Sequence, residues 1–425
     1  MAAVAQSAPS LLLVATSRWV TAARLAMRFR DLGARVAVYS PTDHPLHYVR
    51  GLDRYFTCPT WRPGRSLERA IQSARPDFVL PMDDLAVREL HALAAVGSKM
   101  ESLIARSLGT PAFFSTTRSR AGLLALAGSL GISTPRTALL ASREEAQRLA
   151  AAWPMPAVVK KDGTSNGSGV IFAATAAEVV EAYDKFQHWP SPMMNLKRQI
   201  INGERGAPWG AESLAPAEIS LQSFVAGEPA NAMFACYQGR IIESLQVRSL
   251  WSLHAAGTSM IVERICDPRI LDAGVRLAAA LGISGFFGLD FLLQRAAGDP
   301  ILLEMNPRGT QLGHLPIDPA RHGYSTLAGA LWSAWTGKPE PPLASPAIAP
   351  RIAFFPQGAS LPAESGEDGP AWLDFPDGEP DLARELSKMP WHRRRWIARA
   401  FEALRRPQLY QPVHHEIPDS QPSLK

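Results

Sequence analysis

The chain has 425 residues, of which 46% are hydrophobic and 20% are charged. This composition supplies apolar material for roughly two to four packed units and excludes extended disorder. The 44 basic and 39 acidic residues leave a formal charge of +5. That excess is too small for a chain of this size to indicate a nucleic-acid partner, and none is expected.

The three cysteines, Cys58, Cys236 and Cys266, lie far apart and form no CxxC pair. We therefore expect neither a disulfide framework nor a zinc site, and three reduced thiols suit the cytosol. No apolar run approaches the length of a membrane helix, and the apolar stretch 11–15 lacks the preceding basic residues of a signal peptide. A cytoplasmic protein without a transmembrane segment is expected.

The first hundred residues alternate between buried strands and amphipathic helices. We predict strands at 11–14, 35–39 and 78–80, with helices at 19–32 and around 67–74. This alternation is typical of a parallel sheet with helices on its faces. The first strand–helix turn, residues 15–18, lacks the G-x-G-x-x-G fingerprint of dinucleotide-binding proteins. We expect its hydroxyls to form an ordinary helix cap, with a small-anion site as the alternative.

The middle of the chain predicts an α+β region of mostly short elements. We expect helical structure over 111–152, broken at Pro135, with Ser142 and Glu145 forming a capping box. The remaining predicted elements are strands at 156–159, 170–173, 219–225, 232–237, 240–247, 286–293 and 301–305, and helices at 176–187 and 268–282. Beyond residue 336 we expect loops around one strand, 351–355, and a basic amphipathic helix within 391–406.

A lysine at the end of an apolar strand, Lys160, precedes a loop rich in glycine and serine. Glycines allow backbone N–H groups to approach phosphate oxygens, and the lysine adds a point charge. The order differs from that of a Walker A loop, where the lysine follows the glycines and opens a helix. Here a strand follows, so the pattern predicts a hairpin flap over phosphates, with a plain surface hairpin as the alternative.

Two apolar strands near residue 300 carry acidic and amide side chains. Asp290 interrupts the first strand, and Glu304 and Asn306 share one face of the second. A carboxylate in an apolar strand is costly unless it is paired or bound to a metal. A hairpin would bring the three side chains together as oxygen ligands of the kind that Mg²⁺ takes together with phosphates and water. The alternative is two half-exposed strands whose acids face water.

Lys160 with its loop, then Asp290, then Glu304-x-Asn306-x-Arg308, resembles in this order the ATP-grasp superfamily of ligases. The resemblance covers roughly residues 10–330. It implies an α/β and α+β protein in which a Rossmann-like parallel sheet precedes two α+β lobes that clasp ATP. The implied domains are 1–110, the ATP-grasp domain 111–335 (small lobe about 150–225, C-terminal lobe about 226–335) and a C-terminal extension 336–425.

The resemblance also implies roles for matched positions. ATP and Mg²⁺ (or Mn²⁺) would be the cofactors, with Asp290, Glu304 and Asn306 as metal ligands and Arg308 stabilising the phosphorylated intermediate. Lys160 would contact the nucleotide phosphates. The implied flap residues are Gly163, Ser165, Gly167, Ser168 and Gly169; the implied hinge residues that read adenine are Gln222, Phe224 and Val225.

Three further assignments rest on the same resemblance. Glu228 would hold the ribose hydroxyls, and Arg248 would lie near the γ-phosphate. A second basic phosphate ligand usually precedes a G-[IL]-x-x-P segment by about eleven positions; the segment here begins at Gly131 and points to Arg120. The family often has lysine at this position and glutamate where this chain has Gln222, so both positions depart from its pattern.

The leading hypothesis is therefore an ATP- and Mg²⁺-dependent ligase that activates a carboxylate for attack by an amine or another nucleophile. Its partners would be small carboxylate and amine substrates, and a homodimer is compatible with the pattern. The alternatives are an enzyme that makes carboxyphosphate from bicarbonate, a non-catalytic ATP-binding regulatory module, and a dinucleotide oxidoreductase. The missing glycine fingerprint disfavours the last of these.

Overall fold

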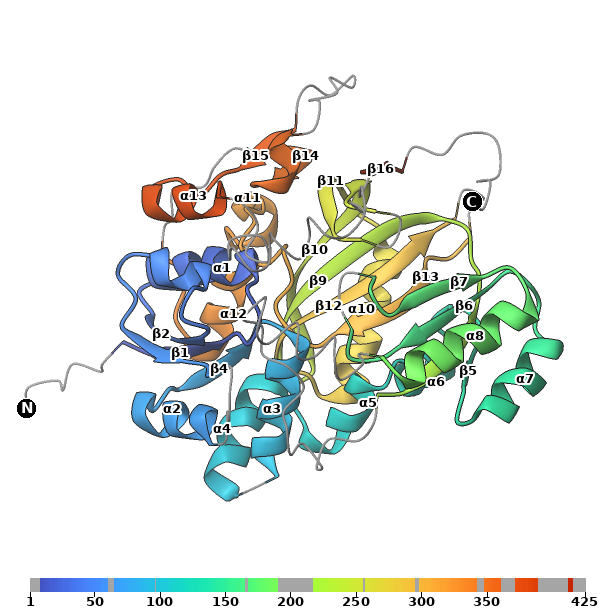
Figure 1. Ribbon diagram of the computed structural model, residues 1–425. Helices are drawn as coiled ribbons and strands as arrows, with labels where there is room; N and C mark the ends of the chain where they lie inside the picture. The colour runs from blue at the N-terminus through green and yellow to red at the C-terminus, as the bar shows by residue number, and fades with distance from the viewer. Residues whose placement is uncertain are drawn as a thin grey trace, which may run out of the picture.

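The structure is a computed structural model that describes residues 8–59, 65–95, 97–164, 167–189, 217–254, 257–294, 298–341, 348–360, 371–388 and 412–415. Three sheets organise it. In Figure 1 the N-terminal sheet lies at the left, a long curved sheet in the centre and a small sheet at the right. Within the described ranges, no helix combines the length and apolarity that a membrane span requires.

The N-terminal sheet is four-stranded and parallel, in the order β3-β2-β1-β4. Its strands are β1 (Ser10–Val14), β2 (Arg35–Ser40), β3 (Arg54–Thr57) and β4 (Phe78–Pro81). Helix α1 (Val20–Asp31) packs on one face, and α2 (Ser66–Ala74), α3 (Asp84–Ala94) and α4 (Ser98–Leu108) pack on the other. The predicted Rossmann-like sheet is confirmed. The short strand β3 escaped prediction because only one of its four side chains is even half-buried.

The turn between β1 and α1 differs from its expected role. The amide N and Oγ1 of Thr16 each donate to the carboxylate of Asp83 at 2.6 Å, and the amide of Ser17 donates to it at 3.1 Å. Helix α1 begins after Trp19, whose side chain makes no capping hydrogen bond. The expected cap is therefore wrong, and the turn's donors are already satisfied by an internal anion.

The small sheet is antiparallel, in the order β5-β8-β6-β7. Its strands are β5 (Thr137–Leu139), β6 (Ala157–Lys161), β7 (Val170–Ala173) and β8 (Ile219–Ser223). Helices α7 (Arg143–Ala151) and α8 (Ala176–Gln187) cover one face with a core of their own. Ser142 caps α7 as expected, by accepting from the amide of Glu145.

The region 111–152 is less helical than expected. It contains a 3₁₀ turn η2 (Pro111–Phe113), α5 (Phe114–Arg118), α6 (Arg120–Ser129) and then β5 before α7. Helix α6 ends before Pro135, and the chain beyond this proline joins the edge of the small sheet. Proline disfavours a helical conformation in the residue before it, which suits an extended segment here.

The central sheet has eight strands, and its main path runs β13-β12-β9-β10-β11-β14-β15, with β16 paired to β10. The strands are β9 (Glu228–Tyr237), β10 (Arg240–Ser252), β11 (Ser259–Ile265), β12 (Gly285–Leu293), β13 (Ile301–Asn306), β14 (Arg351–Phe354), β15 (Trp372–Asp374) and β16 (Val413–His414). Helices α6 and α10 (Pro268–Leu281) share one core with it. Strands β14 to β16 therefore belong to the same sheet as the C-terminal lobe. The domain limits given above stay predictions, and the expected basic helix within 391–406 lies outside the described residues.

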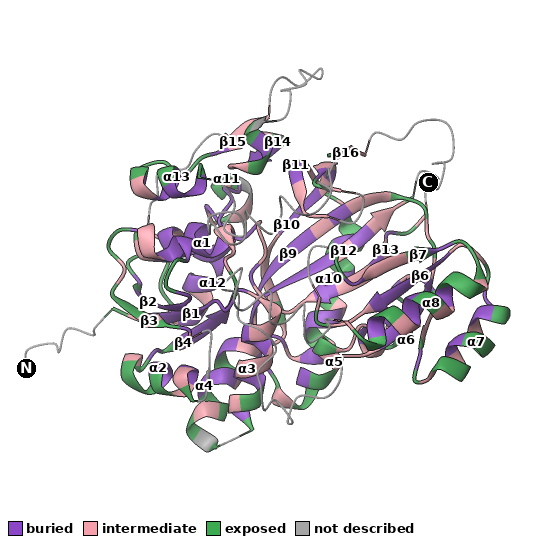
Figure 2. Cartoon of the chain, in the orientation of Figure 1, coloured by how far each residue is buried: buried purple, intermediate pink, exposed green. Residues whose placement is uncertain are grey.

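One hydrophobic core joins the N-terminal unit to the central sheet. Helix α12 (Leu327–Thr336) lies between them, and its Trp335 stacks on Phe78 at 4.3 Å and on Phe29 at 6.1 Å between ring centroids. The same core contains β1 and α1 side chains together with Met233 and Phe286 of the central sheet. Figure 2 shows the interior strands as buried and the outward faces of α2 and α7 as exposed.

Candidate active site

The two acidic strands form the hairpin that the sequence predicts. Asp290 on β12 is paired directly with Glu304 on β13, and with Asn231 on β9 on its other side. The amide nitrogens of Asn231 and Asn306 donate to the two oxygens of Asp290, at 2.6 and 3.1 Å. Cross-strand partners share one face of a sheet, so two carboxyl groups and two amides converge there.

Because the two carboxyl groups lie close together, their pKa values differ: one is raised and the other is lowered. Burial, and next the charge of Glu304, raise the pKa of Asp290 to about 7. Burial works in the same direction on Glu304, but Arg120 and Lys160 outweigh it and hold the pKa of Glu304 at about 2. At neutral pH the pair therefore carries a charge between −1 and −2.

Arg120 at the start of α6 links the two lobes. Its guanidinium donates to Glu304 Oε2 on the central sheet at 2.6 Å and to Asp162 Oδ1 after β6 at 2.9 Å. Its amide N also donates to Asp162 Oδ2, at 3.0 Å. The position to which the sequence spacing pointed thus lies beside the acidic pair, and Asp162 is a site residue that the sequence analysis missed.

Lys160 is a buried cation that has no direct ion-pair partner among the described residues. Its side chain lies on the face of β6 opposite to α7 and α8, because Val159 fills the core beneath those helices. The side chain is 7% exposed and makes no hydrogen bond or ion pair with any of the described residues. Burial, and next repulsion from Arg120, lower the pKa of its ammonium to about 8, even though Glu304, Asp290 and Asp162 attract it.

Arg308 lies beyond the acidic pair, where β13 meets the N-terminal unit. Its guanidinium donates to Asp84 Oδ1 of α3 at 2.8 Å and to Asn306 Oδ1 at 3.1 Å. It also lies 6.0 Å above the ring of Trp19. The N-terminal unit therefore orients Arg308 toward the acidic strand, a contact between residues 224 positions apart that no local pattern reveals.

The glycine-rich segment is a hairpin loop between β6 and β7, as predicted. Gly163 and Gly167 adopt φ of +68° and +70°, the left-handed region that side chains other than glycine rarely enter. A Cβ at Gly169 would lie 2.0 Å from Thr164 Oγ1, so this position also requires glycine. Ser168 is exposed on the loop, and Ser165 lies outside the described residues.

The expected hinge joins β8 to β9. Gln222 on β8 shares a face with Lys160, because it is paired with Val158, two positions from the lysine. Its amide nitrogen donates to Thr137 Oγ1 at 3.2 Å. Phe224 is 37% exposed and packs edge-on against Phe172 of β7.

Val225, expected in the hinge, and Glu228, expected at the ribose, follow Phe224 along the chain. Val225 and Glu228 are both half-buried. A Cβ at Gly227, between them, would lie 2.8 Å from the carbonyl oxygen of Leu293. This close approach of two backbones fixes the path from the small lobe into β9.

Arg248 does not lie where the resemblance implied. It is paired with Ala230 of β9, one position away from the Asn231–Val247 pair that shares the face of Asp290. Its guanidinium is held by Glu263 at 2.5 Å and by Glu228 at 3.3 Å. Arg248 therefore belongs, together with Glu228, to the face of the sheet opposite to Asp290, and a position beside the γ-phosphate does not fit this arrangement.

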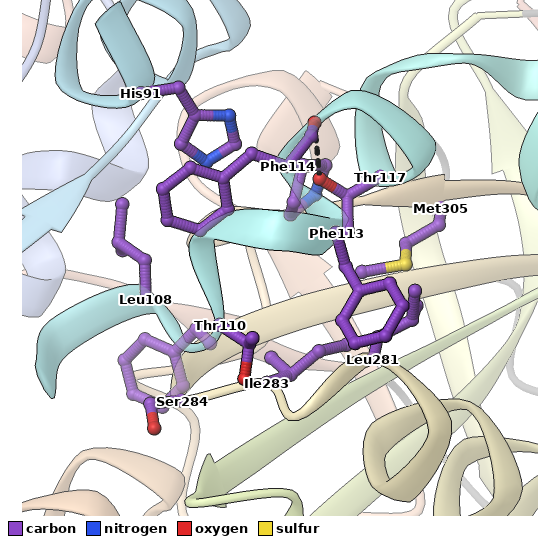
Figure 3. A pocket seen from close by; sticks show the side chains of 12 residues that line it. His91, Leu108, Thr110, Phe113, Phe114, Thr117, Leu281, Ile283, Ser284 and Met305 are labelled. Atoms are coloured by element: carbon purple, nitrogen blue, oxygen red, sulfur yellow. Dashed lines mark hydrogen bonds between the residues drawn. The ribbon is translucent and has the colours of Figure 1, made fainter. Parts of the chain in front are cut away.

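A cavity of about 230 Å³ opens beside the acidic pair. Its walls come from α3, from the segment 115–120, from the loop after β6 and from the end of β13. A neighbouring pocket of about 20 Å³ is lined mainly by apolar side chains, including the stacked rings of His91 and Phe114 (Figure 3). That volume holds about one water, so of these two cavities in the described part of the chain, the larger is the one that can accept a substrate.

A small antiparallel sheet that carries the glycine-rich hairpin and a large mixed sheet that carries the acidic pair define the ATP-grasp fold, and the chain has this fold, as its likeness to solved structures shows. No family model and no curated protein matches the chain. Solved structures do. A biotin carboxylase from Campylobacter jejuni in complex with β-γ-ATP is 14% identical, with a TM-score of 0.54 over 79% of this chain and 72% of that one.

Two further solved structures are similar to the chain. An N5-carboxyaminoimidazole synthase from Aspergillus clavatus, in complex with ADP and 5-aminoimidazole ribonucleotide, is 13% identical, with a TM-score of 0.56 over 79% of this chain and 78% of that one. The biotin carboxylase domain of a Hydrogenobacter thermophilus 2-oxoglutarate carboxylase, a dimer with MgADP and bicarbonate, is 14% identical, with a TM-score of 0.56 over 79% and 71%. At these identities the likeness establishes the fold.

Proposed function

We propose that the chain is an ATP- and Mg²⁺-dependent ligase that activates a small carboxylate as an acyl phosphate, which an amine or another nucleophile then attacks. The observation that carries the proposal is the pairing of Asp290 with Glu304 beside a buried ammonium, Lys160, that makes no direct ion pair with any described residue. A structural ion-pair network would neutralise its buried charges internally. A site built to accept an anion keeps a cation without a direct partner, as Lys160 is here.

The acidic pair fits a divalent ion. Asp290, Glu304 and Asn306 offer carboxylate and amide oxygens, the donors that Mg²⁺ and Mn²⁺ accept. Two buried carboxyl groups in contact repel each other, and here a shifted proton and the guanidinium of Arg120 relieve that repulsion. An ion bound by these oxygens would neutralise phosphate charge during transfer. To admit it, Asp290 must lose its proton and Arg120 must release Glu304.

The nucleotide would lie along β8. Its base would contact the hinge at Phe224 and Val225, and Gln222 has a side-chain oxygen that can accept from an adenine amino group. Lys160 is paired with Ser220, two positions before Gln222, so the phosphates would run toward the start of β8. The loop from Gly163 to Gly169 would close over them, and Arg120 offers the phosphates a second cation.

The chemistry needs no protein nucleophile. A carboxylate oxygen of the substrate forms a bond to the γ-phosphorus of ATP, and the bond from that phosphorus to the bridging oxygen of ADP breaks. The nucleophile then attacks the acyl carbon, inorganic phosphate leaves, and an amine loses its proton to the solvent. Arg308 is held by Asp84 and donates to Asn306, one of the proposed metal ligands. From this position its charge would stabilise the acyl phosphate.

Bicarbonate is the second candidate for the acid, giving carboxyphosphate. The Hydrogenobacter thermophilus structure is a complex with bicarbonate and MgADP, and this supports testing bicarbonate first. The non-catalytic alternative is less well supported, because the two carboxyl groups, Asn306 and Arg308 are all retained at one place. The oxidoreductase alternative loses its basis at the β1–α1 turn, whose donors bind Asp83.

The test is a coupled assay of ADP release, with bicarbonate, amino acids and small carboxylates screened against amine acceptors. We expect release to require one acid and Mg²⁺, and Glu304→Gln to abolish both turnover and the effect of Mg²⁺ on nucleotide affinity. Glu144→Gln, an exposed glutamate in the first turn of α7, is the matched control and should behave as the wild type. Tight ATP binding without turnover across the screen would favour the non-catalytic module instead.

A further inference from the structure

The proposed function leaves two arginines of the larger cavity without a role. Arg88 comes from α3 of the N-terminal unit, and Arg118 is the last residue of α5. Both line the cavity together with Glu304 and Asn306. Arg88 also approaches the flap, because a Cβ built on Gly163 would lie 3.6 Å from its guanidinium.

The charges around the cavity are unevenly neutralised. Arg120 is bound by Asp162 and Glu304, and Asp84 is bound by Arg308. Glu218, which also lines the cavity, accepts from Ser119 Oγ at 2.6 Å. Arg118 donates from Nε to the carbonyl oxygen of Phe114 but makes no ion pair with a carboxylate of the described residues.

The two arginines also lie close enough to repel each other. Burial, and next the charge of Arg118, lower the pKa of Arg88. Two guanidiniums that face one cavity and disfavour each other's charge are stabilised when an anion lies between them. The planar guanidinium is also the side chain whose donor geometry matches carboxylates and phosphates.

The position of the cavity indicates which substrate would occupy it. The hinge follows the end of β8 at Ser223, whereas the cavity lies at its start, at Glu218. The five residues of β8 between these points span about 16 Å. A nucleotide whose base contacts the hinge would have its γ-phosphate near Lys160 and Glu304, with the cavity beyond it. Phosphoryl transfer requires the attacking oxygen in line with the leaving oxygen, on the far side of the phosphorus from ADP.

We propose that Arg88 and Arg118 hold an anionic group of the acid substrate, so that the acid is a small dianion whose second carboxylate faces the γ-phosphate. This inference rests on the proposed function and gives its substrate class. The N-terminal unit then supplies part of the acid site, because Arg88 and the partner of Arg308, Asp84, both lie on α3.

The test is calorimetric titration of the full chain, saturated with MgADP, with acetate, succinate, sulfate and inorganic phosphate. At least one dianion should bind more tightly than acetate. Arg88→Gln and Arg118→Gln should each weaken that binding at least about tenfold, as expected for loss of a charge-assisted hydrogen bond, and leave the affinity for MgADP within about twofold. Arg118→Lys should restore part of the binding. Arg143→Gln, an exposed arginine on α7 that pairs with Asp184, is the matched control.

The outcomes separate the two proposals. If the wild type binds no MgADP, the proposed function fails and this inference fails with it. If MgADP binds but no dianion does, or if neither arginine variant weakens the dianion, the inference alone is overturned. A loss of MgADP affinity as large as the loss of dianion affinity would make the two arginines ligands of the nucleotide, which also overturns it.

Discussion

Lys160→Met is expected to make the nucleotide-free protein more stable while removing its affinity for ATP. Lys160 is 7% exposed, and its ammonium makes no ion pair with a described residue. Methionine has a similar length and no charge, and it fills irregular space readily. A charge retained for a ligand costs stability until the ligand binds, so the two properties should change in opposite directions.

The magnitude follows from the proton affinity of the buried amine. The ordinary pKa of 10.5 falls to about 8, which corresponds to about 3 kcal/mol of unfavourable free energy for the charged form. This figure already includes the attraction of Glu304, Asp290 and Asp162, because the pKa shift sums all charge interactions of the ammonium. We therefore expect Lys160→Met to raise the free energy of unfolding by about 3 kcal/mol at pH 7.

The pH dependence has a definite sign. Above pH 8 the folded wild type loses the proton of Lys160 while the unfolded chain keeps it up to about pH 10.5, so the wild type gains stability relative to the variant. The advantage of Lys160→Met should fall to about 1 kcal/mol at about pH 9.5. Urea unfolding at both pH values, without nucleotide and with the slope m compared, measures it. A variant that is less stable than the wild type at pH 7, or an advantage that grows with pH, would refute the reasoning.

Two further predictions concern the fold. Asp374→Ala should lower the free energy of unfolding by about 3–5 kcal/mol, because it leaves buried Arg24 of α1, which donates to Asp374 at 2.5 Å, without its partner. Asp381→Ala, which breaks an exposed ion pair, should change the free energy of unfolding by under about 1 kcal/mol. Gly274→Ala should destabilise by about 1–2 kcal/mol, since its Cβ would lie 2.4 Å from a ring carbon of Phe234. In contrast, Gly128→Ala, with nothing nearer than 3.9 Å, should stabilise α6 by up to about 1 kcal/mol. Urea unfolding at pH 7 measures all four, and equal effects within either pair would contradict the packing argument.

The acidic hairpin could be predicted because its signal is local. Strands β12 and β13 are apolar runs with period-two polar positions, and a carboxylate within such a run needs a partner. The pairing of Asp290 with Glu304 confirms the predicted hairpin. The parallel N-terminal sheet was predictable for the same reason, because its central strands are short apolar runs between amphipathic helices.

The rest depends on contacts between distant segments. Asp162 and Asn231 are ordinary polar residues in the sequence, and only the fold brings them to Arg120 and Asp290. The face of Arg248 depends on the register of β9 with β10, a 13-residue strand whose pairing shifts between Ile241 and Glu243. A shift of one position moves every side chain beyond it to the other face of the sheet. The face on which Arg248 lies therefore cannot be predicted from its distance to a motif in the sequence.

The aromatic stack of Phe29, Phe78 and Trp335 has a consequence for how the chain can be divided. A fragment that begins after residue 110 would lack Phe29 and Phe78 and would expose a wall of tryptophan and leucine from α12 to water. Such a fragment should aggregate. The N-terminal unit therefore cannot be removed without exposing the core that it shares with the central sheet. The small lobe builds its interior from its own strands and helices, so its exchange would leave that shared core closed.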